Sequence, residues 1–177
     1  MAKREGAVRN IVLIGFMGAG KSVTGRYLAT KLSREMISTD ELIERKEGRP
    51  ISTIFQESGE VYFQQAEEDV VKDIFRRENL VIDCGGGIIL NRKNITRLKK
   101  NGVLIYLKTS PDVAYQRLKH QSNRPLLNTS NPQQKIQQLL TERTPLYQQA
   151  LYTVDTDGKT AEQVGDEILK LLSEKQT

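Results

Sequence analysis

The chain has 177 residues, of which 37% are hydrophobic and 28% are charged. This balance is too apolar for a disordered chain and too polar for a bundle of membrane helices, and the apolar runs, such as 11–14, are far shorter than the roughly 20 residues of a membrane helix. We therefore expect a single domain over 1–177 with no membrane association. No signal-peptide pattern follows the charged N-terminus, which predicts a cytoplasmic protein.

The charge and the scarce metal ligands favour a small anionic ligand. Lys and Arg number 27 against 22 Asp and Glu, which gives a formal net charge of +5. Nucleic-acid binding is disfavoured, because the sequence has no tryptophan and its charges are mixed in sign. The single cysteine, Cys84, cannot form an internal disulfide, and the single histidine, His120, leaves too few ligands for a structural zinc ion.

Short β-branched runs alternate with longer amphipathic segments, which is typical of a parallel sheet covered by helices on both faces. We expect strands at 10–14, 35–37, 80–83, 103–107 and 152–154. We expect helices at 22–32, 40–46, 51–57, 60–77, 92–100 after the cap Asn91, from Pro111 onward, 133–144 and 161–172. The polar segment between 120 and 132 predicts a loop and a candidate lid.

A complete G-x-x-x-x-G-K-S motif follows the first predicted strand and opens the first predicted helix. Glycines let backbone N–H groups turn inward around phosphate oxygens, and the helix N-terminus adds partial positive charge. Lys21 is expected to bridge the β- and γ-phosphates, and the hydroxyl of Ser22 to bind Mg²⁺. A dinucleotide-binding turn is disfavoured by the spacing and by the Lys-Ser pair. The nucleotide-binding candidates are Gly15, Gly18, Ala19, Gly20, Lys21, Ser22 and Val23.

Two carboxylates follow predicted strands, at the edge of the sheet where the motif lies. Mg²⁺ requires oxygen ligands, which Asp40 and Asp83 could supply directly or through water. A simpler interpretation makes Asp40 a helix N-cap and Asp83 a turn residue. Both interpretations stay open from the residues alone.

A second glycine cluster, 85–87, follows the third predicted strand, where bare backbone can approach a ligand closely. Arg117, Arg124 and Arg143 lie in or beside the polar loop, and such arginines can neutralise a transferring phosphoryl group. Taken singly, each arginine is more often a solvated surface charge.

Taken together and in their order along the chain, these segments resemble those of the shikimate kinases. This family consists of small P-loop kinases that are related in structure to nucleoside-monophosphate kinases. The resemblance runs from Asn10 to about Leu172. It rests on the motif at 15–22, Thr39-Asp40, Ile43-Glu44, Ile54-Phe55, Gly59-Glu60, Phe63, Glu67, the glycines at 85–87, the run 124–127, Glu142-Arg143 and Pro145-Leu146-Tyr147. It implies a three-layer α/β/α P-loop NTPase fold with a five-stranded parallel sheet, a helical substrate-binding region at about 40–70 and a lid at about 119–132.

The resemblance also implies an activity and a set of residue roles. It implies transfer of the γ-phosphoryl group of ATP, with Mg²⁺, to the 3-hydroxyl of shikimate in aromatic amino-acid biosynthesis, by an enzyme that we expect to be a monomer. Asp40 would bind that hydroxyl and act as its base, while Arg124 would reach the γ-phosphate and Arg117 would pack on adenine. Arg143 would hold the substrate carboxylate. The remaining substrate-contact candidates are Phe63, Gln64, Glu67, Gly85, Gly86 and Gly87.

The chain departs from the family pattern at two positions. The family usually reads Asp-x-Asp where this chain has Ser38 and Asp40, so the candidate metal ligands are Ser22, Asp83 and Ser38. The family usually has an arginine at position 64, where this chain has Gln64. A charged contact to a carboxylate is worth about 1.5–3 kcal/mol, so its loss predicts roughly ten- to a hundredfold weaker binding of shikimate.

These departures leave two alternatives to a shikimate kinase. One is a kinase of the same fold that acts on another polyol, such as one without a carboxylate. The other is a nucleotide-binding regulatory homologue with weak or no turnover. The presence of Lys21, Asp40, Arg124 and Arg143 argues against the second.

Overall fold

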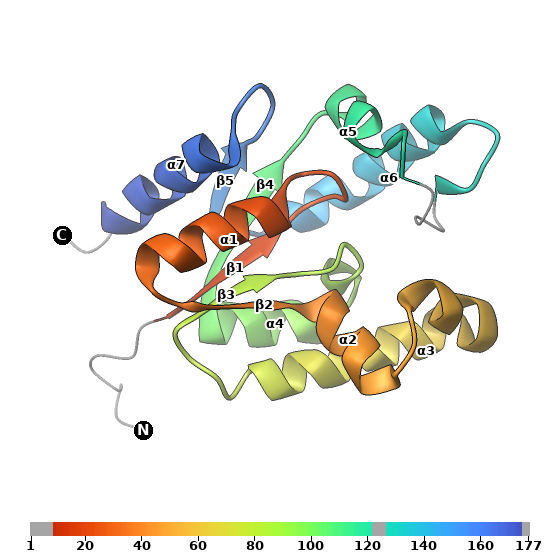
Figure 1. Cartoon of the computed structure of the whole chain (residues 1–177), viewed down its shortest axis with the longest axis horizontal. Coiled ribbons are helices and arrows are strands. Elements are labelled where there is room, and N and C mark those ends of the chain that lie inside the picture. The colour runs from red at the N-terminus through yellow and green to blue at the C-terminus, as the bar shows by residue number, and fades with distance from the viewer. Residues whose placement is uncertain (1–8, 122–126, 175–177) are drawn as a thin grey trace.

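The computed structural model describes residues 9–121 and 127–174, and its centre is one five-stranded sheet in the order β2–β3–β1–β4–β5. All four strand pairings are parallel, so the carboxyl ends of the strands lie along one edge of the sheet (Figure 1). The α/β class and the five-stranded parallel sheet are confirmed. The strands are β1 (Asn10–Ile14), β2 (Glu35–Ser38), β3 (Leu80–Asp83), β4 (Gly102–Lys108) and β5 (Tyr152–Asp155).

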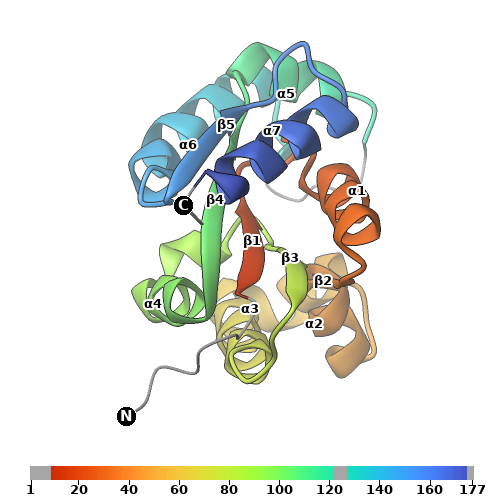
Figure 2. The same cartoon turned by 90° about the vertical axis from the view of Figure 1, so that its left-hand side faces the viewer.

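Helices cover both faces of the sheet and complete three layers (Figures 1 and 2). The helices α1 and α7 pack on one face, and α3, α4 and α6 pack on the other. The helices are α1 (Lys21–Leu32), α2 (Thr39–Glu47), α3 (Ile51–Ile74), α4 (Arg92–Asn101), α5 (Pro111–Leu118), α6 (Pro132–Tyr147) and α7 (Ala161–Ser173), and a short 3₁₀ helix, η1, spans Ile88–Leu90.

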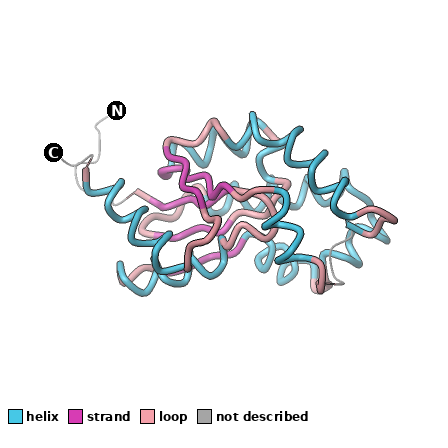
Figure 3. Tube along the Cα trace, turned by 90° about the horizontal axis from the view of Figure 1, so that it is seen from above, coloured by secondary structure: helices cyan, strands magenta, loops and turns pink. Residues whose placement is uncertain are grey.

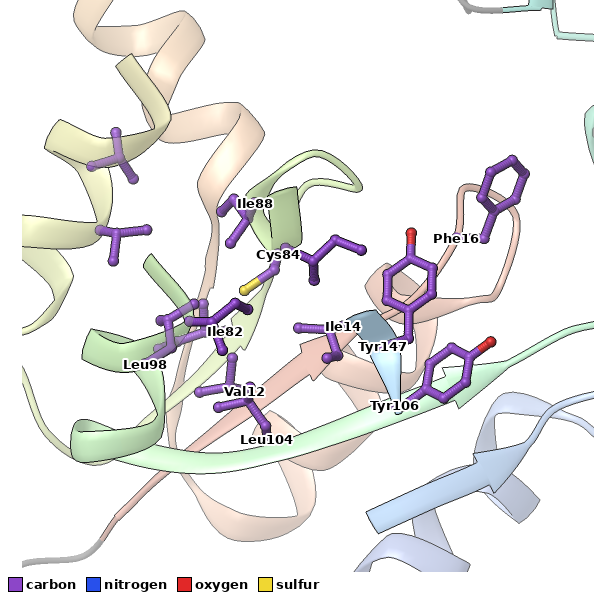
Figure 4. Close-up of a cluster of buried hydrophobic side chains, with 14 of the residues drawn as sticks. Val12, Ile14, Phe16, Ile82, Cys84, Ile88, Leu98, Leu104, Tyr106 and Tyr147 are labelled. Carbon is purple, nitrogen blue, oxygen red and sulfur yellow. The ribbon is translucent and has the colours of Figure 1, made fainter. Parts of the chain in front are cut away.

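Two hydrophobic cores hold the layers together, one on each face of the sheet. Successive side chains of β1 alternate between them: Val12 and Ile14 enter the core with α3, α4 and α6, and Ile11 and Leu13 enter the core with α1 and α7. Figure 4 shows the first core, where the stacked rings of Tyr106 and Tyr147 lie near Ile14. Burial on both faces explains why the strands are continuous apolar runs.

Two helical pairs extend past the carboxyl ends of the strands, as Figures 1 and 3 show. One is α2 with α3, and the other is α5 with α6. They place side chains of both pairs above the same edge of the sheet. No helix in the two described ranges is long and apolar enough to cross a membrane.

The predicted break between two helical pieces at Gly59 is confirmed by its non-helical backbone, with φ of 79° and ψ of 177°. The prediction that the second piece reaches Arg77 is wrong, because α3 ends at Ile74. The sequence did not indicate η1, which forms directly after the glycine cluster.

The end of α6 was also predicted wrongly, at about Thr144. The helix continues through Pro145 to Tyr147, whose side chain is fully buried. The ring of Tyr147 stacks on Tyr106 with a centroid separation of 4.9 Å. Burial of this aromatic side chain outweighs the hydrogen bond that proline removes from the last turn.

The predicted lid at about 119–132 is described only in part. Arg124 lies outside the described residues, so its predicted place at the γ-phosphate stays a prediction. The start of α6 is described, and Asn131 caps it by accepting a hydrogen bond from the N–H of Gln134 at 3.1 Å.

Candidate active site

The loop between β1 and α1 has the geometry of a phosphate-binding loop. Gly20 caps α1 in the left-handed region, with φ of 85°, which a side chain would strain. Lys21 begins the helix, and its Nζ donates to the carbonyl oxygens of Gly15 at 3.0 Å and Phe16 at 3.1 Å. The ammonium group therefore lies over the loop, next to a helix N-terminus that favours anions. Gly18, Ala19, Ser22 and Val23 belong to the same loop and first helical turn.

A serine and an aspartate meet at the edge of the sheet beside this loop. The hydroxyl of Ser22 donates to Oδ2 of Asp83 at 2.5 Å, and the Asp83 side chain is almost fully buried. Ser38 is the register partner of Asp83 on β2. In the described ranges, no group of three or more His, Cys, Asp or Glu side chains could hold a metal ion alone. The oxygens of Ser22 and Asp83 fit a Mg²⁺ ion that is also bound by phosphate.

Ser38, and not Asp40, is the N-cap of α2. The hydroxyl of Ser38 accepts a hydrogen bond from the N–H of Glu41 at 3.3 Å. The interpretation of Asp40 as a helix cap is therefore wrong. Its carboxylate belongs to the first turn of α2, where it lies over the backbone of Gly85.

The approach of Asp40 to the glycine cluster explains why a glycine occupies position 85. A Cβ at Gly85 would lie 2.1 Å from Oδ1 of Asp40, closer than any side chain allows. The N–H of Gly85 also donates to the hydroxyl of Thr39 at 2.8 Å. Sequence reasoning missed this role of Thr39, although the Thr39-Asp40 pair was its signal.

A cavity of about 350 Å³ opens beside Asp40, between α2, α3, the glycine cluster and α6. All but one of the predicted substrate-contact residues line it, the exception being Gly85. They are Asp40, Phe63, Gln64, Glu67, Gly86, Gly87 and Arg143. Two apolar residues that line the cavity, Met17 and Leu90, were not predicted from the sequence. The available signal was their position, because Met17 lies within the motif at 15–22 and Leu90 follows the glycines at 85–87.

Arg143 brings a guanidinium group to the inner wall of this cavity. Its side chain is 8% exposed, and Nη1 donates to the carbonyl oxygen of Gly86 at 3.3 Å. Tyr147, one turn further along α6, is also buried, and desolvation raises the pKa of its phenol to about 12 against the opposing charge of Arg143. A buried guanidinium with donors to spare is suited to a carboxylate.

Gln64 and Phe63 form the part of the wall contributed by α3. The ring of Phe63 packs on Phe55, with centroids 4.7 Å apart. Nε2 of Gln64 donates to Oε1 of Glu60 at 3.3 Å. The amide of Gln64 therefore leaves Arg143 as the only cationic side chain among the described residues that line the cavity.

The cavity is rich in carboxylates. Five acidic residues line it together with Arg143: Asp40, Glu41, Glu44, Glu60 and Glu67. Glu67 is the most deeply buried, at 2% exposure, and desolvation followed by the charge of Asp40 raises the pKa of its carboxyl to about 8. Of these acids, the sequence singled out Asp40 and Glu67 as substrate contacts.

Arg117 lies at the nucleotide side of the edge. Its Nη1 donates to the carbonyl oxygen of Gly18 at 2.9 Å, and Nη2 donates to that of Thr156 at 3.2 Å. The guanidinium therefore joins the phosphate-binding loop to the segment that follows β5. Sequence reasoning missed Thr156.

A carboxylate next to a phosphate-binding loop can accept the proton of a hydroxyl that attacks a bound nucleotide. The fold and the site together thus define a P-loop kinase, a phosphotransferase with an alcohol acceptor and a nucleotide substrate. The family model for shikimate kinase matches residues 17–173, and the chain belongs to this family.

Relatives and solved structures agree with this assignment. The chain is 45% identical to a shikimate kinase of Thermodesulfovibrio yellowstonii, over 92% of this chain and 94% of the relative. It is similar to the structure of a shikimate kinase from Acinetobacter baumannii in complex with shikimate, with a TM-score of 0.92 and 41% identity over 95% and 94% of the two chains. The Aquifex aeolicus shikimate kinase has a TM-score of 0.83 at 34% identity, over 94% and 98%.

Proposed function

We propose that this chain transfers the γ-phosphoryl group of ATP to the 3-hydroxyl of shikimate. The observation that carries the proposal is one cavity beside the phosphate-binding loop, which holds Asp40 at one wall and the guanidinium of Arg143 at another. A substrate with both a hydroxyl and a carboxylate matches these two groups. The Acinetobacter baumannii relative, solved in complex with shikimate, supports the same acceptor.

Each residue has a distinct role in this reaction. Lys21 binds the β- and γ-phosphates and neutralises charge that develops during transfer. Asp40 binds the attacking hydroxyl and accepts its proton. Arg143 holds the substrate carboxylate, and the backbone of Gly86 contacts the substrate. The proposal also assigns the γ-phosphate to Arg124, which lies outside the described residues.

The remaining candidates bind or shape the two substrates. Arg117, next to the loop, packs on adenine, while Phe63 and Gln64 of α3 and the glycines at 85–87 surround the acceptor. Ser22 and Asp83 would hold a Mg²⁺ ion, with Ser38, the register partner of Asp83, beside them. When bound, that ion supplies positive charge against the phosphates.

The proposal includes the setting of the reaction. We infer a cytoplasmic enzyme that works as a monomer on a small-molecule acceptor, without nucleic acid. The free, buried Cys84 suits a reducing compartment, and ATP is available there.

A coupled assay of ADP release, with shikimate, quinate, gluconate and an uncharged polyol compared at equal concentration, tests the acceptor. We expect the highest kcat/KM with shikimate. The alternative, an acceptor without a carboxylate, is favoured by Gln64 and by the five carboxylates of the cavity. ADP release that is faster with an uncharged polyol than with shikimate would establish that alternative, and ATP binding without transfer to any polyol would establish a regulatory protein.

Asp83→Asn is expected to raise the Mg²⁺ concentration for half-maximal activity several-fold, with little change in Tm. Ser38 supplies no carboxylate, so Asp83 is the anionic side chain closest to Ser22 at this edge. A magnesium titration of the activity measures the effect. Asp155→Asn, at the end of β5, is the matched control, because Asp155 is exposed. Identical titration curves for wild type and Asp83→Asn would show that Asp83 has no part in binding the metal.

Gln64→Arg is expected to lower the KM for shikimate roughly ten- to a hundredfold, because a second guanidinium would complete a two-point grip on the carboxylate. Steady-state kinetics with shikimate measure the change. Gln65→Arg adds the same charge on the exposed side of α3 and serves as the control. An unchanged KM for shikimate, together with impaired turnover of an uncharged polyol, would contradict the proposed acceptor.

A further inference from the structure

Glu67 is a buried acid at the wall of the acceptor cavity, and its Oε1 has no hydrogen-bond partner in the structure. Oε1 lies 3.0 Å from the position that a Cβ of Gly87 would occupy, so the carboxyl packs against bare backbone. A buried polar atom without a partner costs free energy unless a ligand satisfies it. Glu67 is therefore placed to contact the acceptor.

The charged groups around Glu67 come from every element that packs on it. Asp40 of α2 and Glu60 of α3 act against its ionisation, and Arg143 of α6 acts in favour of it. Cys84, after β3, also faces it, and burial raises the pKa of that thiol well above its ordinary value of 9.0, so it stays neutral. Two neighbouring carboxylates thus raise the pKa of Glu67, and one guanidinium lowers it. Together with burial, the two carboxylates keep most Glu67 carboxyls protonated at pH 7, since the pKa of Glu67 is about 8.

We propose that Glu67, as the neutral acid, donates a hydrogen bond to the carboxylate of the acceptor and so takes over part of the role of the arginine that Gln64 replaces. The proposal rests on the proposed function, because shikimate supplies the carboxylate. Arg143 then holds the carboxylate with charge, and Glu67 holds it with an O–H···O⁻ hydrogen bond, which is among the stronger kinds. No proton leaves Glu67 in the reaction.

Ionised Glu67 has the opposite effect on binding. It faces the substrate carboxylate with a like charge and competes with it for Arg143. The bound carboxylate in turn favours the neutral acid, so that shikimate binding and proton uptake at Glu67 are linked. Shikimate binding therefore weakens as the pH rises through the pKa of Glu67, and a group that cannot ionise at this position removes the dependence.

The first test is the KM for shikimate between pH 7 and 9.5, in wild type and in Glu67→Gln. In wild type we expect KM to rise about tenfold per pH unit above an apparent pKa near 8, or about thirtyfold at pH 9.5, while the KM for ATP changes little. The glutamine amide keeps a donor and cannot ionise, so the rise should disappear. Glu60→Gln is the matched control, because Glu60 is an exposed acid of the same cavity and its variant should keep the alkaline rise.

A second variant and a second measurement keep the inference testable if Glu67→Gln does not fold. Gln64→Arg places a cation three residues before Glu67 on α3, which lowers the pKa of Glu67 and should move the rise in KM to lower pH without a change at position 67. Calorimetry with shikimate alone, at pH 8 in buffers of different ionisation enthalpy, should detect uptake of up to about half a proton by wild type.

The outcomes separate this inference from the proposed function. Phosphorylation of shikimate with the same alkaline rise of KM in wild type and Glu67→Gln, or binding without proton uptake, would overturn the role of Glu67 alone. Failure of wild type to phosphorylate shikimate at any pH would overturn the proposed function as well. A flat profile in Glu67→Gln and a rise moved to lower pH in Gln64→Arg, with the rise kept in Glu60→Gln, support the inference.

Discussion

Lys21→Ala is expected to reduce kcat by a factor of about 10²–10³, with the fold intact. Lys21 supplies a fixed positive charge to the phosphate-binding loop, where its Nζ lies on the carbonyl oxygens of Gly15 and Phe16. Charge that develops on a transferring phosphoryl group needs such a cation, and each preorganised group of this kind is worth about 10²–10³ in rate. Steady-state ADP release with saturating ATP and shikimate measures the loss.

The fold of this variant is checked by its Tm, which should stay close to that of wild type, because Lys21 packs in neither hydrophobic core. Lys31→Ala, near the end of the same helix, is the matched control and should keep full activity. Retention of most activity by Lys21→Ala would refute the assignment of the phosphate-binding loop.

Asp40→Asn is the second variant with a large expected effect, a fall in kcat of about 10²- to 10⁴-fold. An amide has nearly the size of the carboxylate, so it fits over Gly85, but it cannot accept the proton of the attacking hydroxyl. The KM for ATP should change little, since Asp40 lies in the acceptor cavity. Single-turnover measurements of phosphoryl transfer separate this chemical step from product release.

Glu41→Gln is the control for this variant. Glu41 follows Asp40 on α2 and lines the same cavity, but it is exposed and has no assigned part in the transfer. A comparable loss of kcat in both variants would show that charge in the cavity matters, and that Asp40 is not the base.

The fold was predictable because its main signals are local. The apolar runs of β1 and β3 each fill both faces of a buried strand, and the G-x-x-x-x-G-K-S motif at 15–22 marks the junction between strand and helix. The break in α3 at Gly59 was predictable from the sequence, because glycine is the residue that most easily adopts the positive φ found there. The end of α6 could not be predicted from the sequence, because it depends on the burial of Tyr147 against Tyr106, a contact between distant parts of the chain.

The residues of the candidate site were predictable to a similar extent, and their electrostatics were not. Asp40, Arg143 and the glycine cluster stand in segments that resemble the family, so their meeting at one cavity follows from the topology. That Glu67 loses nearly all contact with water depends on the approach of distant parts of the chain to α3, such as the backbone of Gly87. Propensity and spacing carry no information about such desolvation.

The most direct test of the central claim is identification of the product by ¹H–³¹P correlated NMR after reaction of the wild-type chain with ATP, Mg²⁺ and shikimate. We predict one new phosphate monoester, coupled to the proton at carbon 3 of shikimate, formed together with one equivalent of ADP. Formation of ADP without a phosphorylated shikimate, or a phosphate at another hydroxyl, would contradict the account.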